Sequence, residues 1–127
     1  MNKKELEDRL INLAVLIIGM VESMPTTRAA NHLGGQLLRS GSSPALNYGE
    51  AQSAESLNDF IHKIKIVLKE LRETLVCLKI ILRTKLYSSE EKIQLALKET
   101  DELIAIFVQS AKTAQRNNET QQKQKRL

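Results

Sequence analysis

The sequence predicts an all-α protein that folds as an antiparallel up-down four-helix bundle. In four separate segments, apolar residues recur at alternating steps of three and four residues, which places them on one face of an α-helix. No segment of comparable length alternates apolar and polar residues with a period of two, as a half-buried strand does. The 127 residues include five glycines and two prolines, too few for a β-fold with many turns. A chain of this length forms one hydrophobic core, so we expect one helical domain.

The first predicted helix covers about residues 3–23. We expect this helix to end just before Pro25, because α geometry is disfavoured for the residue that precedes a proline. Its main apolar face consists of Leu6, Leu10, Leu13, Ile17, Met20 and Met24. A second apolar group, roughly 100–180° around the helix, consists of Ile11, Val15 and Ile18. Exposed apolar groups usually mark an interface, so we interpret this group as a contact between subunits; the alternative is a wide core face with scattered surface residues.

The second predicted helix covers about residues 27–49, with Thr26 or Thr27 as its N-cap. Its core face consists of Ala30, Leu33, Leu37, Gly41, Pro44 and Tyr48. Each helical glycine costs roughly 1 kcal/mol relative to alanine but permits a close approach of a neighbouring helix; these glycines are Gly34, Gly35 and Gly41. Because Pro44 lacks a backbone donor, we expect a helix kinked near Pro44, in preference to two short helices.

A polar stripe accompanies this second segment. It consists of Gln36, Ser43, Asn47 and Glu50. If these side chains are buried, hydrogen bonds between helices fix the register of the bundle. No histidine joins the stripe, and a lone carboxylate makes a poor catalytic site. We therefore favour a structural network over a catalytic one.

The third predicted helix carries the strongest periodic signal. A strict four–three alternation places eight apolar residues on one face: Leu57, Ile61, Ile64, Leu68, Leu71, Leu75, Leu78 and Leu82. Ser56 with Asp59 resembles a capping box in which Asp replaces the usual Glu. A second apolar group lies away from the heptad face and is also a candidate subunit contact; it consists of Ile66, Cys77 and Ile80.

A basic stripe runs along the same helix. Its side chains recur at steps of four, three, seven and four residues, within roughly 80° of arc; they are Lys65, Lys69, Arg72, Lys79 and Arg83. Such a stripe can follow a phosphate backbone. The alternatives are a solvated face, or ion pairs with acidic residues of the fourth segment; the relevant acidic residues are Glu99, Asp101 and Glu102.

The fourth predicted helix begins after residues 85–89, where Ser88 and Glu91 fit a capping box. Its apolar face consists of Ile93, Leu97, Thr100, Ile104, Phe107 and Ala111. Residues 112–127 contain five basic side chains and one acidic side chain, and the chain as a whole carries a net charge of +4. We expect residues 1–115 to form the bundle and residues 116–127 to form a basic polar tail that is either frayed or a continuation of the fourth helix.

The composition argues against several classes of function. One cysteine and two histidines, far apart in the sequence, leave no ligand set for a metal. No Gly-rich phosphate loop occurs, so the sequence predicts no catalytic, cofactor or metal site and no small-molecule substrate. The longest apolar stretch, residues 10–21, is shorter than the roughly 20 residues of a membrane span. A start of mixed charge disfavours a signal peptide, so we expect a cytoplasmic protein with reduced Cys77.

Four motifs point to a family. They are Gln36–Ser43 ("QLLRSGSS"), Asn47–Ala51 ("NYGEA"), Asp59–Lys63 ("DFIHK") and Lys69–Leu75 ("KELRETL"). Together they resemble the bacterial four-helix-bundle proteins first noticed in intervening sequences of large-subunit ribosomal RNA genes, which are sometimes labelled ribosomal proteins. The resemblance covers about residues 6–111. Pro44, Leu46 and Cys77 depart from the usual residue types, and all three departures concern packing.

The resemblance implies an up-down bundle that assembles into a cyclic homo-oligomer, often a pentamer, without known catalytic activity. Related bundles are accessory proteins of diversity-generating retroelements, in which a basic pentamer binds reverse transcriptase and nucleic acid. Two hypotheses follow. In the first, the bundle is a homo-oligomer that presents its basic stripe and tail to structured RNA or DNA. In the second, it is a scaffold for protein–protein interaction that binds no nucleic acid.

Overall fold

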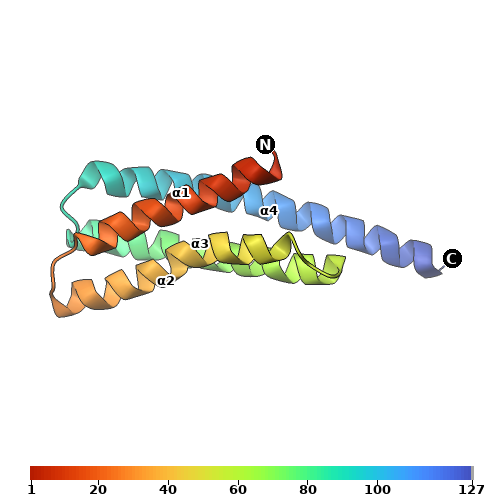
Figure 1. Cartoon of the computed structure of the whole chain (residues 1–127), viewed down its shortest axis with the longest axis horizontal. Coiled ribbons are helices and arrows are strands. Elements are labelled where there is room, and N and C mark those ends of the chain that lie inside the picture. Colours follow the sequence, from red (N-terminus) through yellow and green to blue (C-terminus); the bar gives the residue numbers. More distant parts are fainter. Residues whose placement is uncertain (127) are drawn as a thin grey trace.

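The chain forms four α-helices. A computed structural model describes residues 1–126, and its helices are α1 (Lys3–Glu22), α2 (Arg28–Ala51), α3 (Leu57–Thr84) and α4 (Glu90–Arg126). No strand occurs within those residues. Figure 1 shows each helix running back alongside the helix that precedes it. The all-α four-helix bundle predicted from apolar spacing is confirmed.

Side-chain caps define where the helices begin. Thr27 Oγ1 accepts a hydrogen bond from the amide of Ala30 at 3.2 Å, and Ser56 Oγ accepts one from the amide of Asp59 at 3.0 Å, so both predicted caps are confirmed. The predicted cap of α4 is wrong by one residue. Ser89 rather than Ser88 accepts the amide hydrogen bond, from Lys92 at 3.3 Å. Two adjacent serines cannot be separated by spacing, because any residue three positions on supplies the backbone donor.

Pro44 lies inside α2, which is continuous from Arg28 to Ala51. The alternative of two short helices is therefore wrong, and the kink remains a prediction. Pro44 is buried. The helix continues through Pro44 with one backbone hydrogen bond fewer, because proline has no N–H to donate.

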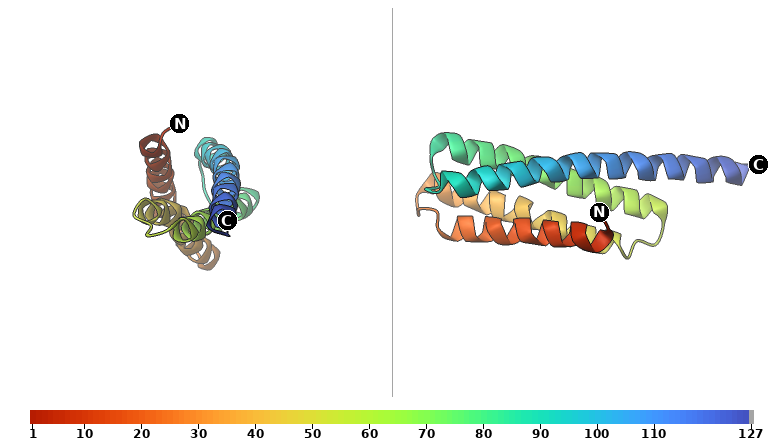
Figure 2. Two further views of the ribbon diagram at one scale, coloured as in Figure 1. Left: turned by 90° about the vertical axis from the view of Figure 1, so that its right-hand side faces the viewer. Right: turned by 90° about the horizontal axis from the view of Figure 1, so that it is seen from above.

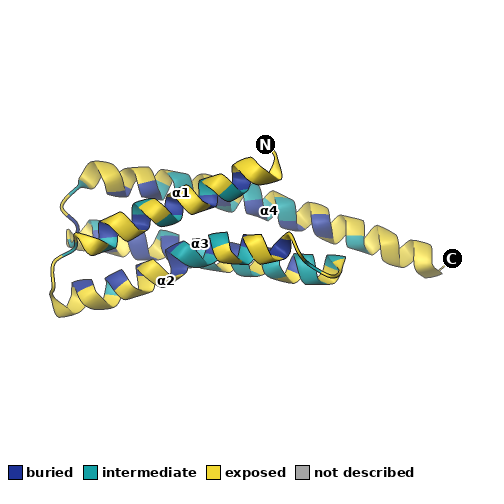
Figure 3. Cartoon of the chain, in the orientation of Figure 1, coloured by how far each residue is buried: buried dark blue, intermediate teal, exposed yellow. Residues whose placement is uncertain are grey.

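The predicted apolar faces meet in one core, as the dark inward-facing stripes in Figure 3 show. Within it, Tyr48 and Phe107 pack edge to face, with ring centroids 5.4 Å apart. Gly41 brings α1 and α2 close together. A Cβ atom at that position would lie 2.5 Å from Ile17 Cδ1, so the missing side chain is what permits this approach.

The four helix pairs do not pack equally. α2 packs closely on α3, α3 on α4 and α1 on α2, whereas α1 packs thinly on α4. The end-on view in Figure 2 shows α1 and α4 set apart. Arg9 bridges them, with Nε 2.9 Å from Glu99 Oε2 and Nη2 2.9 Å from Glu102 Oε2. These hydrogen bonds raise the pKa of Arg9, the bond to Glu99 most of all.

The last turns of α4 extend beyond the other three helices (Figures 1 and 2). We call residues 116–126 the arm. Within the arm only Asn118 is partly buried, and its Nδ2 donates a hydrogen bond to Asn58 Oδ1 at 2.8 Å. The arm therefore continues the fourth helix, and Leu127 lies outside the described residues. None of the helices within residues 1–126 combines the length and the hydropathy needed to cross a bilayer.

Candidate functional site

The basic stripe lies on the outer surface of α3. All five of its side chains are exposed: Lys65, Lys69, Arg72, Lys79 and Arg83. They project beside the heptad face, toward the flank on which α4 packs. The stripe begins in the third turn of α3, at Lys65, and reaches the last turn, so it follows about two thirds of the helix.

Two shallow hollows between α3 and α4 follow one another along this stripe, and we call them together the groove. The first hollow, of about 460 Å³, has Leu68 and Val108 at its floor and Lys65, Lys69 and Arg72 at its rim. The second hollow, of about 450 Å³, continues the groove toward the other end of the bundle. It is lined by Leu75, Lys79, Leu82, Arg83, Gln94, Leu97, Lys98 and Asp101. The groove therefore combines an apolar floor with basic walls.

The charges of the stripe are not neutralised within residues 1–126. No ion pair there involves any of its five side chains; the charged pairs lie elsewhere. Two of the candidate acidic partners on α4 pair with Arg9 instead, namely Glu99 and Glu102. Asp101 lines the second hollow without such a pair. A row of unpaired cations beside a groove attracts a polyanion.

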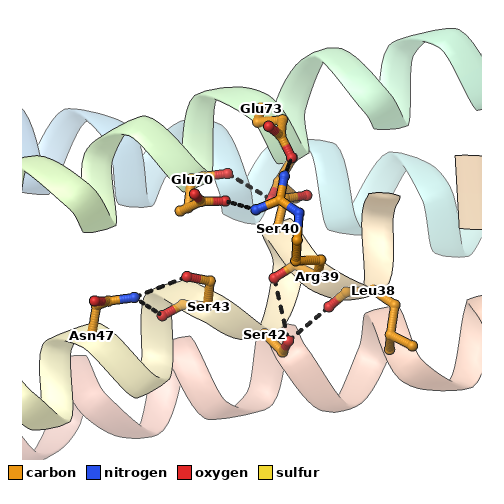
Figure 4. A network of polar contacts seen from close by, with 9 residues as sticks. Leu38, Arg39, Ser40, Ser42, Ser43, Asn47, Glu70 and Glu73 are labelled. Atoms are coloured by element: carbon orange, nitrogen blue, oxygen red, sulfur yellow. Dashed lines mark hydrogen bonds and ion pairs between the residues drawn. The ribbon is translucent and has the colours of Figure 1, made fainter. Parts of the chain in front are cut away.

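The polar stripe of α2 is divided between two kinds of contact. Asn47 Nδ2 donates to Ser43 Oγ at 2.9 Å within the helix. Glu50 reaches α3, where its Oε2 lies 2.5 Å from Lys63 Nζ, and this hydrogen bond raises the pKa of Lys63. Gln36 is exposed. Figure 4 shows Ser43 and Asn47 one turn apart on α2. One contact between helices therefore comes from this stripe.

A stronger set of polar contacts joins α2 to α3 and was missed in the sequence. Arg39 pairs with two carboxylates, Glu70 at 2.8 Å and Glu73 (Figure 4). Beneath them, the hydroxyls of Ser40 and Thr74 lie 3.0 Å apart, and Thr74 Oγ1 donates to the carbonyl of Glu70 at 2.8 Å. Both hydroxyl residues are fully buried.

The signal for these contacts was present in the motifs. Arg39 and Ser40 belong to the motif at residues 36–43, and their partners all belong to the motif at residues 69–75. The Glu50–Lys63 pair joins the other two motifs. The four motifs therefore meet along the seam between α2 and α3. The pattern within a single helix does not show which residues of two helices form pairs.

The apolar candidates for subunit contact fall into different environments. On α1, Ile11, Val15 and Ile18 are 41%, 62% and 42% exposed. On the adjacent α2, Leu38 and Leu46 are exposed as well. On α3, Ile80 is exposed and Ile66 is half-buried. α2, which packs on α1, thus carries exposed apolar residues that the sequence analysis did not include.

Cys77 lies inside the protein, not on its surface. It is 5% exposed, and its Sγ lies 3.5 Å from the carbonyl oxygen of Leu33 on α2. Burial raises the pKa of the Cys77 thiol. The residue lies away from the heptad face, as expected, but α2 covers that flank of α3. Cys77 is therefore a packing residue of the α2–α3 seam.

The part of the chain that the structure describes holds no cluster of three or more metal-ligating side chains. His32 and His62 are both exposed, on α2 and α3. Two candidate sites are left on the described surface, namely the basic groove and the exposed apolar residues of α1 and α2.

Comparisons with known proteins agree with the motifs. A family model described as 23S rRNA-intervening sequence protein matches residues 3–109. Among solved structures, the chain is similar to a protein of unknown function from the S23 ribosomal protein family of Bacteroides thetaiotaomicron. The TM-score is 0.79 and the sequence identity is 28%, over 88% of this chain and 99% of that chain. A search of curated proteins finds no match. Neither matching description names a catalytic activity.

Proposed function

The chain belongs to the family of 23S rRNA-intervening sequence proteins, and from that premise we propose that it is a non-enzymatic, homo-oligomeric bundle that binds structured RNA or DNA through the basic stripe of α3. The observation that carries the proposal is the row of exposed, unpaired cations along the α3–α4 groove. A phosphate backbone is the polyanion that such a row fits, because it offers regularly spaced negative charges.

The dimensions of the stripe support this function. Eighteen residues separate Lys65 from Arg83, which corresponds to about 27 Å at roughly 1.5 Å per residue. At about 3.4 Å per base pair, that length matches roughly eight base pairs of a duplex. The stripe is thus long enough to contact several successive phosphates.

Self-association of the chain would strengthen this binding to nucleic acid. The exposed apolar residues of α1 and α2 supply a surface whose burial stabilises contact between copies; they are Ile11, Val15, Ile18, Leu38 and Leu46. The resemblance implies a ring, often a pentamer. A ring brings several basic grooves onto one particle, which strengthens binding to an extended nucleic acid through multivalency.

The direct test measures binding of structured RNA and duplex DNA across a series of salt concentrations. The variant K65Q/K69Q/R72Q removes three charges from the stripe, and the matched control K3Q/R28Q/K92Q removes three exposed charges from other surfaces. Affinity falls as salt rises, and each lost phosphate contact makes the slope of log affinity against log salt less steep by about 1. We call the magnitude of this slope the salt slope. We expect a decrease of about 3 for the stripe variant and little change for the control. Equal losses in both variants contradict a site on α3.

A second test concerns the oligomer. Light scattering on the full chain is expected to give a mass several times that of one chain. Val15→Asp places a charge on the exposed apolar group of α1 and is expected to lower that mass. Leu95→Asp, at a residue of similar exposure on α4, serves as the control. A single-chain mass for the unmodified protein would overturn the oligomeric part of the proposal.

A protein-interaction scaffold is the alternative that the same exposed apolar residues favour. It requires no binding of nucleic acid. Absence of salt-dependent affinity tighter than about 10⁻⁴ M near physiological salt would reject the first proposal. Retention of the oligomer under those conditions would support the scaffold.

A further inference from the structure

A second basic row lies on α4. Its members recur at steps of fourteen, four and seven residues and share one side of the helix, within roughly 40° of arc at 100° per residue; they are Lys98, Lys112, Arg116 and Lys123. All four side chains are exposed. No ion pair within residues 1–126 involves them.

This row borders the same groove as the α3 stripe and then leaves the bundle. Lys98 lines the hollow that contains Lys79 and Arg83. Lys112 lines the hollow that contains Lys65 and Lys69. The other two members of the row lie on the arm, which starts beside the first turn of α3 and whose later turns project past the bundle in Figure 1. What composition alone marks as a basic tail is therefore an ordered extension of one wall of the groove.

We propose that double-stranded nucleic acid lies along the α3–α4 groove and continues along the arm, held by the α3 stripe and by the α4 row together. This inference rests on the proposed function and adds to it the class of ligand and the length of the site. The shared chemistry is the paired phosphate backbone of a duplex, which either RNA or DNA supplies.

The aromatic residues explain why a duplex is the better ligand. Proteins that bind single strands gain about 1–3 kcal/mol per base by stacking bases on aromatic rings. The chain has four aromatic residues. Three of them are buried, namely Tyr48, Tyr87 and Phe107. Phe60 is half-buried and lines a different hollow, with Met1 and Leu57. Without rings on the groove, a flexible strand loses conformational freedom with no stacking energy in return.

The geometry also gives a site length. Arg83 and Gln94 line the same hollow, at one end of the groove. From Gln94 to Lys123 there are 29 residues, or about 44 Å along α4 at roughly 1.5 Å per residue. A duplex parallel to the helix would cover about 13 base pairs over that distance, compared with roughly eight for the α3 stripe alone, at about 3.4 Å per base pair.

The test uses the full chain with blunt RNA and DNA duplexes of increasing length. For the unmodified protein, affinity is expected to rise up to about 13 base pairs, the length of one groove, and then to level off until a longer duplex reaches a second groove of the oligomer. For R116Q/K123Q it is expected to level off near eight base pairs, and the salt slope is expected to fall by about 2. A length dependence that is the same in both proteins overturns the inference. RNA and DNA series that differ identify which duplex the groove accepts.

A matched pair of single variants tests whether the position of a charge on the arm matters or only the total charge of the arm. Lys123 and Lys125 lie two residues apart, on sides of α4 that differ by about 160° at 100° per residue. K123Q is expected to lower the salt slope by about 1, and K125Q is expected to leave it unchanged. Equal effects would show that charge alone acts and would overturn the inference while leaving the proposed function intact. If no duplex binds the unmodified chain, the proposed function itself fails.

Discussion

The α2–α3 seam and the α1–α4 seam hold the bundle together in different ways. Between α2 and α3, fully buried Ser40 and Thr74 lie beneath the pairs of Arg39, and both helices pack closely. Between α1 and α4, packing is thin, and Arg9 forms the ion pairs across it. The hollow of about 440 Å³ beside Arg9 is lined by Leu13, Leu16 and Leu95, among others. The comparison indicates that α2 and α3 form the central pair, and that α1 and α4 are outer helices, each held mainly by one neighbour.

The largest expected effect comes from shortening a buried leucine of α3, and it is compared with shortening a leucine beside the α1–α4 seam. Leu71 on α3 is fully buried, so Leu71→Ala should lower the free energy of unfolding by about 2–5 kcal/mol. Leu16 is half-buried beside the α1–α4 hollow, so Leu16→Ala should cost at most about 1 kcal/mol, because less apolar surface loses its contacts. Urea unfolding measures both. Equal losses would show that the two seams contribute alike.

A smaller effect is expected from the buried hydroxyl pair. Thr74→Val removes one hydroxyl and leaves that of Ser40 without its partner on α3, so we expect a loss of about 1–3 kcal/mol. In the double variant S40A/T74V no unpaired hydroxyl remains, and stability should recover in part. Thermal unfolding of the two single variants and the double variant gives the coupling energy. A coupling near zero would mean that the pair does not join the helices energetically.

The smallest effect on global stability is expected at Arg9. Its pairs are partly exposed, so Arg9→Gln should change the free energy of unfolding by less than about 1 kcal/mol. Locally, however, α1 loses its bridge to α4. Hydrogen exchange should therefore become faster in the first half of α1 and stay unchanged in α3. Arg39→Gln is the control on the other seam, where the buried hydroxyl pair remains and exchange should change little.

Apolar spacing was sufficient to predict the four helices and most of their core faces, because burial imposes the helical period directly. It left out Val67, Ile81 and Leu103, which are fully buried, and it included Leu57 and Leu75, which are only half-buried. It could not show which flank of a helix has a neighbour. Cys77 and Ile80 both lie off the heptad face of α3, yet α2 covers the first and leaves the second exposed.

The site was predictable in part. The stripe of α3 was visible from its period, whereas the row on α4 required knowledge that the polar tail is helical. Its composition contains no apolar face from which a helix is inferred. The pairing of Arg39 with Glu70 and Glu73 joins residues more than thirty positions apart, and no local pattern reports such a distance.

The burial of Cys77 has a consequence for how copies of this chain hold one another. The chain has a single cysteine, and its sulfur lies under α2. Two such sulfurs cannot approach to the bonding distance of a disulfide unless each bundle first opens. Copies of the intact fold are therefore not joined to one another by disulfides, and the extent of any assembly is expected to follow protein concentration instead of redox conditions.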